Sequence, residues 1–150
     1  MTAFISPDFD VPRTVEFEHF RLEVLGPEHN ERDHAAWSGS MEHIHATPGF
    51  EGHPWPMPMT LEENLDDMEM HAREFEERTA FTWSILQAGT DDVIGCIYLY
   101  PLDPPSEGHG RFRSWVTAAR GADDAQVRAT IADWFDATFP ITVTHWTPSA

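Results

Sequence analysis

Three side chains in the second half of the sequence, Tyr98, Glu107 and His109, have the chemistry of proton donors and acceptors. Glu107 and His109 lie in a stretch rich in proline and glycine, which predicts a loop. A carboxylate or an imidazole there could take a proton from a substrate, directly or through water. Tyr98 and Tyr100 could give a proton or form a pocket wall, although tyrosines in an apolar strand more often belong to the core. Glu107 and His109 are candidates by position alone, and exposed loop residues without a function remain the simpler interpretation.

A second group of candidates surrounds residues 46–59, where prolines and glycines alternate with aromatic, histidine and methionine side chains. These prolines and glycines exclude a helix or an inner strand, so the segment is predicted to be a loop. Phe50, His53 and Trp55 of this loop, with Trp37 from the preceding helix, could line a substrate pocket or a subunit interface. A loop that packs on its own core explains the pattern equally well.

The remaining metal-ligating and nucleophilic side chains predict no further site. His43, His45 and His53 gather near two glutamates, but their spacing is not that of a zinc site, so we expect no metal. The single cysteine, Cys96, alternates with apolar residues and is expected to be buried and inert. A single cysteine cannot form an internal disulfide. The simplest expectation from this cysteine content is a cytoplasmic protein.

Charge narrows the range of partners. The 150 residues contain 26 acidic residues against nine arginines and no lysine, which gives a formal net charge of −17. This charge repels nucleic acid and anionic membranes, so we expect neither as a partner. A solvated surface, a cationic partner and adaptation to high salt could each explain the acidity. The first twelve residues lack the pattern of a secretory signal, and no apolar run approaches membrane-spanning length.

Hydrophobic periodicity predicts one α/β domain preceded by an arm. Residues 1–15 are irregular and form the arm, and residues 16–150 form the domain. The expected order is strand, two helices, three strands, helix and strand, over residues 20–24, 28–44, 60–78, 80–86, 93–100, 112–117, 125–139 and 141–144. Helices therefore flank a mixed, mostly antiparallel central sheet, and the last helix crosses over to the final strand.

One strand runs directly into a loop and a helix at residues 113–135, an arrangement that often binds phosphate. Unpaired N–H groups and the helix dipole both favour an anion at such a helix start. Two carboxylates, Asp123 and Asp124, stand in this loop and oppose an anion. They are also well placed to cap the helix and to interact favourably with its dipole.

In this order and spacing of elements, the chain resembles the GNAT family of N-acetyltransferases. The segment FRLEVLGPEHNERDHAAW is similar to the family's opening strand and first helix, and residues 60–79 to its second helix. The segment FTWSILQAGTDDVIGCIYLYP is similar to the hairpin that leads into the central strands. The segment SWVTAARGADDAQVRATIADWF is similar to the coenzyme-binding strand, the pyrophosphate loop and the third helix.

The resemblance implies acetyl-CoA as a co-substrate, held in a cleft where the fourth and fifth strands separate. The family's loop has Arg or Gln, two residues, Gly, one residue, and then Gly or Ala. Arg120 and Ala125 match its ends, whereas Asp123 stands at the place of the first glycine. Carried over by position, the pantetheine-lining residues would be Trp115, Val116 and Thr117, and the pyrophosphate-loop residues would be Arg120, Gly121, Ala122 and Ala125.

A second departure lies after the fifth strand, where the family normally continues with a helix and two strands. That helix often carries a tyrosine that protonates the departing thiolate, and no residue here matches it. We therefore expect a C-terminally abbreviated GNAT-like domain, whose cleft is either completed by a second subunit or left incomplete.

The resemblance implies an N-acetyltransferase that passes an acetyl group from acetyl-CoA to a small amine or another cationic small molecule. The alternative is a degenerate, non-catalytic GNAT fold that serves as a ligand-binding or protein-interaction module, which Asp123 favours. We also expect a homodimer, because the last strand would otherwise be an unprotected sheet edge.

Overall fold

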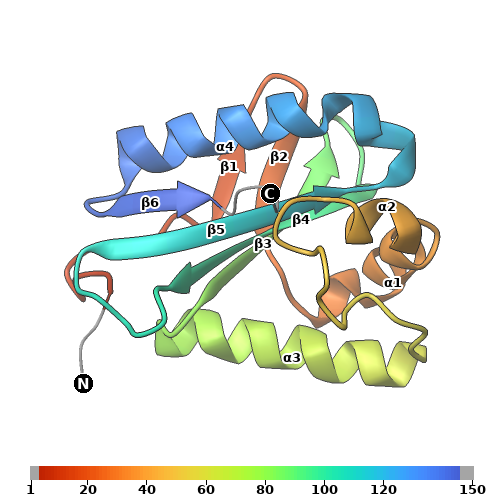
Figure 1. Cartoon of the computed structure of the whole chain (residues 1–150), viewed down its shortest axis with the longest axis horizontal. Helices are drawn as coiled ribbons and strands as arrows, with labels where there is room; N and C mark the ends of the chain where they lie inside the picture. Colours follow the sequence, from red (N-terminus) through yellow and green to blue (C-terminus); the bar gives the residue numbers. More distant parts are fainter. Residues whose placement is uncertain (1–3, 146–150) are drawn as a thin grey trace.

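The computed structural model describes residues 4–145, which form one six-stranded sheet with helices on both faces (Figure 1). The strands lie in chain order across the sheet. Each strand is antiparallel to its neighbour except the last two, which are parallel and joined through a helix. This mixed, mostly antiparallel α/β architecture confirms the predicted fold class.

The helices and strands have well-defined bounds. The strands are β1 (Thr14–Glu16), β2 (Phe20–Val24), β3 (Phe81–Gln87), β4 (Val93–Pro101), β5 (His109–Val116) and β6 (Thr142–His145). The helices are η1 (Pro27–His29), α1 (Asn30–Ser38), α2 (Met41–His45), α3 (Leu61–Glu77), η2 (Ala118–Asp123) and α4 (Asp124–Thr138), where η marks a 3-10 helix. None of the described helices is both long and apolar enough to cross a membrane.

The two faces of the sheet carry separate apolar clusters. On the face covered by α4, Trp83 and Phe112 pack with Phe135 of that helix. On the opposite face, Trp37 and Trp115 belong to a second cluster, which α1, α2 and α3 cover (Figure 1). Side chains of β5 alternate between the two clusters, as the two-residue period of a strand requires. The strand therefore supports both layers.

The structure differs from the predicted elements at three places. A short strand, β1, joins residues 14–16 to β2 across the predicted boundary between arm and domain. The single helix predicted over residues 28–44 is interrupted at Gly39 and Ser40, which separate α1 from α2. His109 begins β5 rather than lying in the preceding loop. The capping box predicted at Thr60 is present, with Thr60 and Glu63 exchanging hydrogen bonds of 2.9 and 3.1 Å.

Gly95 allows β4 to approach β5 closely at the end where the loop to α4 begins. The two strands pair from Pro101 and Gly110 to Gly95 and Val116. A Cβ atom at position 95 would lie 2.3 Å from the backbone oxygen of Trp115. Since no real Cβ contact is that short, a side chain at this position would push the two strands apart.

We expect Gly95→Ala to lower the free energy of unfolding by about 1–3 kcal/mol, the usual cost of overpacking a core. The matched control is Gly39→Ala, whose Cβ would make an ordinary 3.6 Å contact with the oxygen of Ala35. We expect the control to change stability by less than about 0.5 kcal/mol. Urea unfolding of both variants tests the expectation, and equal stabilities would contradict it.

Candidate functional site

An aromatic pocket of about 330 Å³ opens between α1, α3, the loop of residues 46–59, the second half of β4 and the middle of β5. Its walls combine aromatic rings and methionines with a few ionisable groups. The lining residues are Leu25, Asp33, Phe50, His53, Trp55, Met57, Asn64, Asp67, Met68, Met70, His71, Tyr98, Tyr100 and Arg113. Such a mixture of apolar walls and few polar groups is typical of small-molecule sites.

The residues predicted to bind substrate come together here. Phe50, His53 and Trp55 line the pocket. Trp37 stands behind this wall, fully buried, with its ring centroid 5.6 Å from that of Trp55. The same loop also packs on the core, since Phe50 is fully buried.

Arg113 of β5 lies within the aromatic rings of the pocket. Its guanidinium stands over Phe50 at 4.6 Å, Tyr100 at 5.5 Å and Tyr98 at 5.7 Å from the ring centroids. Its Nη1 donates a 2.7 Å hydrogen bond to the backbone oxygen of Gly49. These contacts connect the loop to β5 and place a fixed positive charge in the wall.

Asp33 is a buried carboxyl that lines the pocket, and no local sequence pattern marks it as a site residue. Only 5% of its surface is exposed, and its Oδ2 accepts a 3.1 Å hydrogen bond from Asn64. Burial raises the pKa of Asp33 to about 6, although the Asn64 bond and nearby histidines, chiefly His71, oppose the shift. Burial likewise raises the pKa of Asp67. A carboxyl that titrates near neutral pH can accept a proton in a reaction.

Of Tyr98, Glu107 and His109, only Tyr98 belongs to this pocket, which Tyr100 also lines. Its hydroxyl accepts a 3.0 Å hydrogen bond from the indole of Trp115, and burial raises its pKa well above the usual value. Burial, and next the charge of Arg113, lower the pKa of His53, which keeps its ring neutral.

Glu107 and His109 lie exposed at the other end of β5 from Val116 and line neither this pocket nor the α4 cavity described below. At about 3.3 Å per residue, the strand separates His109 from Val116 by roughly 23 Å. This placement gives no geometric support to Glu107 or His109 as the base.

The strands β5 and β6 pair only over the first half of β5. The parallel register runs from His109 and Thr142 to Phe112 and His145, and within residues 4–145 the stretch from Ser114 to Val116 has no strand partner on that side. We call this stretch the open edge of β5. A pantetheine arm carries two amides and could pair with such an edge as an added strand would. The side chains of Trp115 and Val116 are buried in the core, so only their backbone groups could pair with such an arm.

The segment predicted to hold a pyrophosphate forms the 3-10 helix η2, and the amides of Ala118, Arg120 and Asp124 have partners within the chain. Ala118 N–H donates to Ser40 Oγ at 2.9 Å, and Arg120 N–H donates to the oxygen of Thr117 at 2.8 Å. Asp124 N–H donates to the oxygen of Gly121. An anion at these three amides would have to displace their present acceptors. The open edge of β5 thus offers backbone groups to a pantetheine arm, whereas these three amides offer no free donor to a diphosphate.

The carboxylates of this segment differ in their partners. Asp123 precedes α4, but its side chain makes no capping hydrogen bond, so the expected cap is not formed. Asp124 is buried and pairs with Arg128 one turn further on. One oxygen of Asp124, Oδ1, is buried without a hydrogen-bond partner in the described chain.

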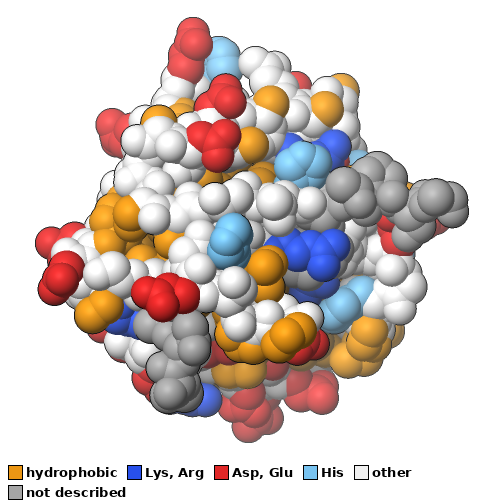
Figure 2. Space-filling model, turned by 60° about the vertical axis from the view of Figure 1, so that its left-hand side comes forward, with side chains coloured by type: hydrophobic (Ala, Val, Ile, Leu, Met, Phe, Trp, Pro, Cys, Tyr) orange, Lys and Arg blue, Asp and Glu red, His pale blue; other side chains and the backbone are white. Residues whose placement is uncertain are grey.

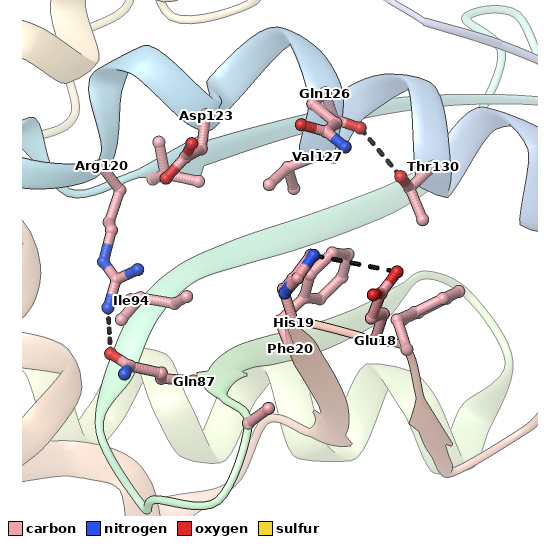
Figure 3. Close-up of a pocket in the computed structure, with 13 residues that line it drawn as sticks. Glu18, His19, Phe20, Gln87, Ile94, Arg120, Asp123, Gln126, Val127 and Thr130 are labelled. Carbon is pink, nitrogen blue, oxygen red and sulfur yellow. Dashed lines mark hydrogen bonds and ion pairs between the residues drawn. The ribbon is translucent and has the colours of Figure 1, made fainter.

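A larger cavity of about 620 Å³ lies on the other face of the sheet, between α4, the β1–β2 turn and the β3–β4 hairpin (Figure 3). We call it the α4 cavity. Arg120 reaches across it to the side-chain oxygen of Gln87, and Asp123 and Gln126 stand along its upper edge. Across residues 4–145, no cluster of three or more His, Cys, Asp or Glu side chains could hold a metal ion.

The buried Asp33 predicts a specific pH dependence of stability. Its pKa is about 6 in the folded chain against 3.8 in the reference state, so folding favours the protonated carboxyl. Its contribution to stability is therefore complete below about pH 4 and is lost as the pH rises through about 6. Relative to wild type, Asp33→Asn should gain up to about 3 kcal/mol between about pH 4 and pH 7.

Urea unfolding at several pH values measures this change. The control is Asp66→Asn on the exposed face of α3, for which we expect a difference below about 0.5 kcal/mol. If Asp33→Asn and wild type kept the same stability difference at every pH, the assignment of Asp33 as a titrating buried group would be wrong.

Comparisons with known proteins place the fold. No family model matches the sequence, and no curated protein matches it. Among solved structures, the acetyl transferase from Salmonella typhimurium that modifies the N-terminal serine of ribosomal protein L7/L12 superposes with a TM-score of 0.61 at 10% identity. The match covers 83% of this chain and 68% of that one. The ribosomal-protein-S5-alanine acetyltransferase from Vibrio fischeri matches with a TM-score of 0.60 at 15% identity, over 85% and 69% of the two chains.

A third match is the Microcin C7 self immunity acetyltransferase, solved in complex with acetyl-CoA and AMP. Its TM-score is 0.61 at 11% identity, over 86% of this chain and 70% of that one. These neighbours are acetyltransferases, and at these identities the likeness establishes the arrangement of helices and strands. The chain has the GNAT fold.

Proposed function

We propose that this protein is an N-acetyltransferase that passes an acetyl group from a thioester to a small amine bound in the aromatic pocket. One observation carries the proposal: Arg113, which is part of the pocket wall, immediately precedes the open edge of β5. A donor lying along that edge would therefore end beside an acceptor in the pocket. The acetyltransferase neighbours support this arrangement.

The pocket walls favour a small cationic acceptor. The rings of Phe50, Trp55 and Tyr98 present π-faces, which attract an ammonium group. Asp33 and Asp67 add two carboxyls against the single charge of Arg113. A volume of about 330 Å³ suits a small amine better than a protein segment.

In the proposed reaction, Asp33 takes a proton from the bound ammonium and leaves a neutral amine. A pKa of about 6 leaves most of the Asp33 carboxyl ionised at neutral pH, as a base must be. The bound thioester supplies an acetyl carbon that forms the C–N bond as its C–S bond breaks, and the remaining amine proton ends on the sulfur. Tyr98 holds its hydrogen bond to Trp115 and shapes the wall where the two substrates meet.

Asp33 thus replaces Glu107 and His109 as the candidate base.

Cytoplasmic location and a homodimer stay predictions within this proposal. Cys96 is buried and free, so no disulfide forms within the described chain. Size-exclusion chromatography with light scattering would determine the oligomeric state.

The second candidate function is a non-catalytic GNAT fold that binds a ligand in the aromatic pocket. The occupied amides of η2 and the acidic Asp123 favour it. Such a protein would bind amines without acetylating them. Incubation with acetyl-CoA and a panel of small alkyl, arylalkyl and polyamine compounds, followed by mass spectrometry of the amines, separates the two functions.

Within the enzyme proposal, Asp33→Asn should lower kcat at least about a hundredfold, because general-base catalysis contributes about 10²- to 10⁴-fold. The pH profile of kcat should also lose its rise near pH 6. The control, Asp66→Asn, makes the same change of charge on the exposed face of α3, so its kcat and pH profile should be those of wild type.

Two further variants, Glu107→Gln and His109→Asn, compare the bases suggested by sequence with the one suggested by geometry. Loss of activity in either of them, with activity kept in Asp33→Asn, would contradict the assignment. The absence of any acetylated amine with wild type would instead favour the non-catalytic function.

A further inference from the structure

We infer that this chain recognises its acyl donor through the pantetheine arm alone and has no subsite for the nucleotide diphosphate of CoA. The inference rests on the proposed function, since it concerns the donor of the same reaction. It widens the donor class from acetyl-CoA to any acetyl thioester on a pantetheine arm. Three observations on the segment of residues 117–124 carry it.

The first observation is that backbone donors at the start of this segment are held from within the chain. Ser40, at the start of α2, accepts from Ala118 N–H, and the oxygen of Ile94 accepts from Thr117 N–H at 2.9 Å. Gly121 packs against His43 of α2, where a Cβ would lie 3.0 Å from the ring. An anion would have to break these contacts before it could bind, since each amide has only one hydrogen to donate.

The second observation is the direction of Arg120, the cation at the head of the segment. Its guanidinium extends over the α4 cavity and bonds to the amide oxygen of Gln87 rather than turning toward the start of α4 (Figure 3). The guanidinium is therefore already engaged within the chain, and it would have to release Gln87 before it could pair with a diphosphate.

The third observation is charge. Asp123 is exposed at the start of α4, and none of the residues described here pairs with it as an ion partner. The whole chain carries a net charge of −17. On the face shown in Figure 2, acidic side chains are spread near the edges, and arginine and histidine side chains lie nearer the centre. Phosphates would meet repulsion both locally and at long range, while an uncharged pantetheine arm would not.

The affinities of CoA and of pantetheine, measured by calorimetry at several salt concentrations, test the inference. Without a diphosphate subsite, the two dissociation constants should agree within about threefold near physiological salt, a difference of less than about 1 kcal/mol. CoA should also bind more tightly as salt rises from about 0.01 M to 0.15 M, because the Debye length falls from about 30 Å to 8 Å and screens the repulsion. Pantetheine binding should not change.

A matched pair of variants locates the repulsion. Asp123→Asn should strengthen CoA binding severalfold at low salt and leave pantetheine binding unchanged. Asp103→Asn makes the same change of charge in the exposed loop before β5, and we expect no such gain. Equal gains in both variants would show that only the net charge matters, which would overturn the role of Asp123.

Two results would overturn the inference, and they can be told apart. If CoA binds more than about tenfold tighter than pantetheine and weakens with salt, a diphosphate subsite exists and the proposed acetyl transfer still stands. If neither compound binds, donor recognition by pantetheine fails and the proposed function fails with it.

Discussion

The close approach of β4 to β5 at Gly95 is the constraint on which the rest of the structure depends. This pairing aligns Tyr98 with Arg113, and both side chains face the aromatic pocket. It also fixes the position at which β5 leaves the sheet and turns into η2. Moving the strands apart here would displace the pocket wall, the open edge of β5 and the start of α4 together, because one strand carries all three.

The proposed reaction sets two opposing electrostatic requirements. An acidic surface and two carboxyls favour a cation in the aromatic pocket, whereas a CoA donor brings phosphates. The fold keeps these apart by presenting an uncharged backbone edge near the pocket and turning Arg120 toward Gln87. A donor that is recognised by its pantetheine arm satisfies both requirements. A chain with a free, positively charged phosphate site at the start of α4 could bind the phosphates of CoA directly and would not need this separation.

Sequence patterns predicted the fold because its signals are local. The capping box at Thr60, the apolar strand of residues 93–100 and the proline after α4 each determine an element by themselves. The aromatic loop was also identifiable, since its prolines exclude regular structure. Asp33 was not, because its role depends on burial against Asn64 and the histidines, which are distant in sequence. The break at Gly39 and the internal bonds of η2 likewise depend on tertiary contacts, such as that of Ser40 with Ala118.

The most direct test of the account is an NMR titration of the backbone amides with acetyl-CoA. A donor that lies along the open edge of β5 should shift the amides of Arg113 to Thr117 and those around Tyr98. The amides of Gly121 to Ala125 should move little, since no phosphate binds them. The largest shifts at Gly121 to Ala125, or no shifts along β5 at saturating acetyl-CoA, would contradict the account.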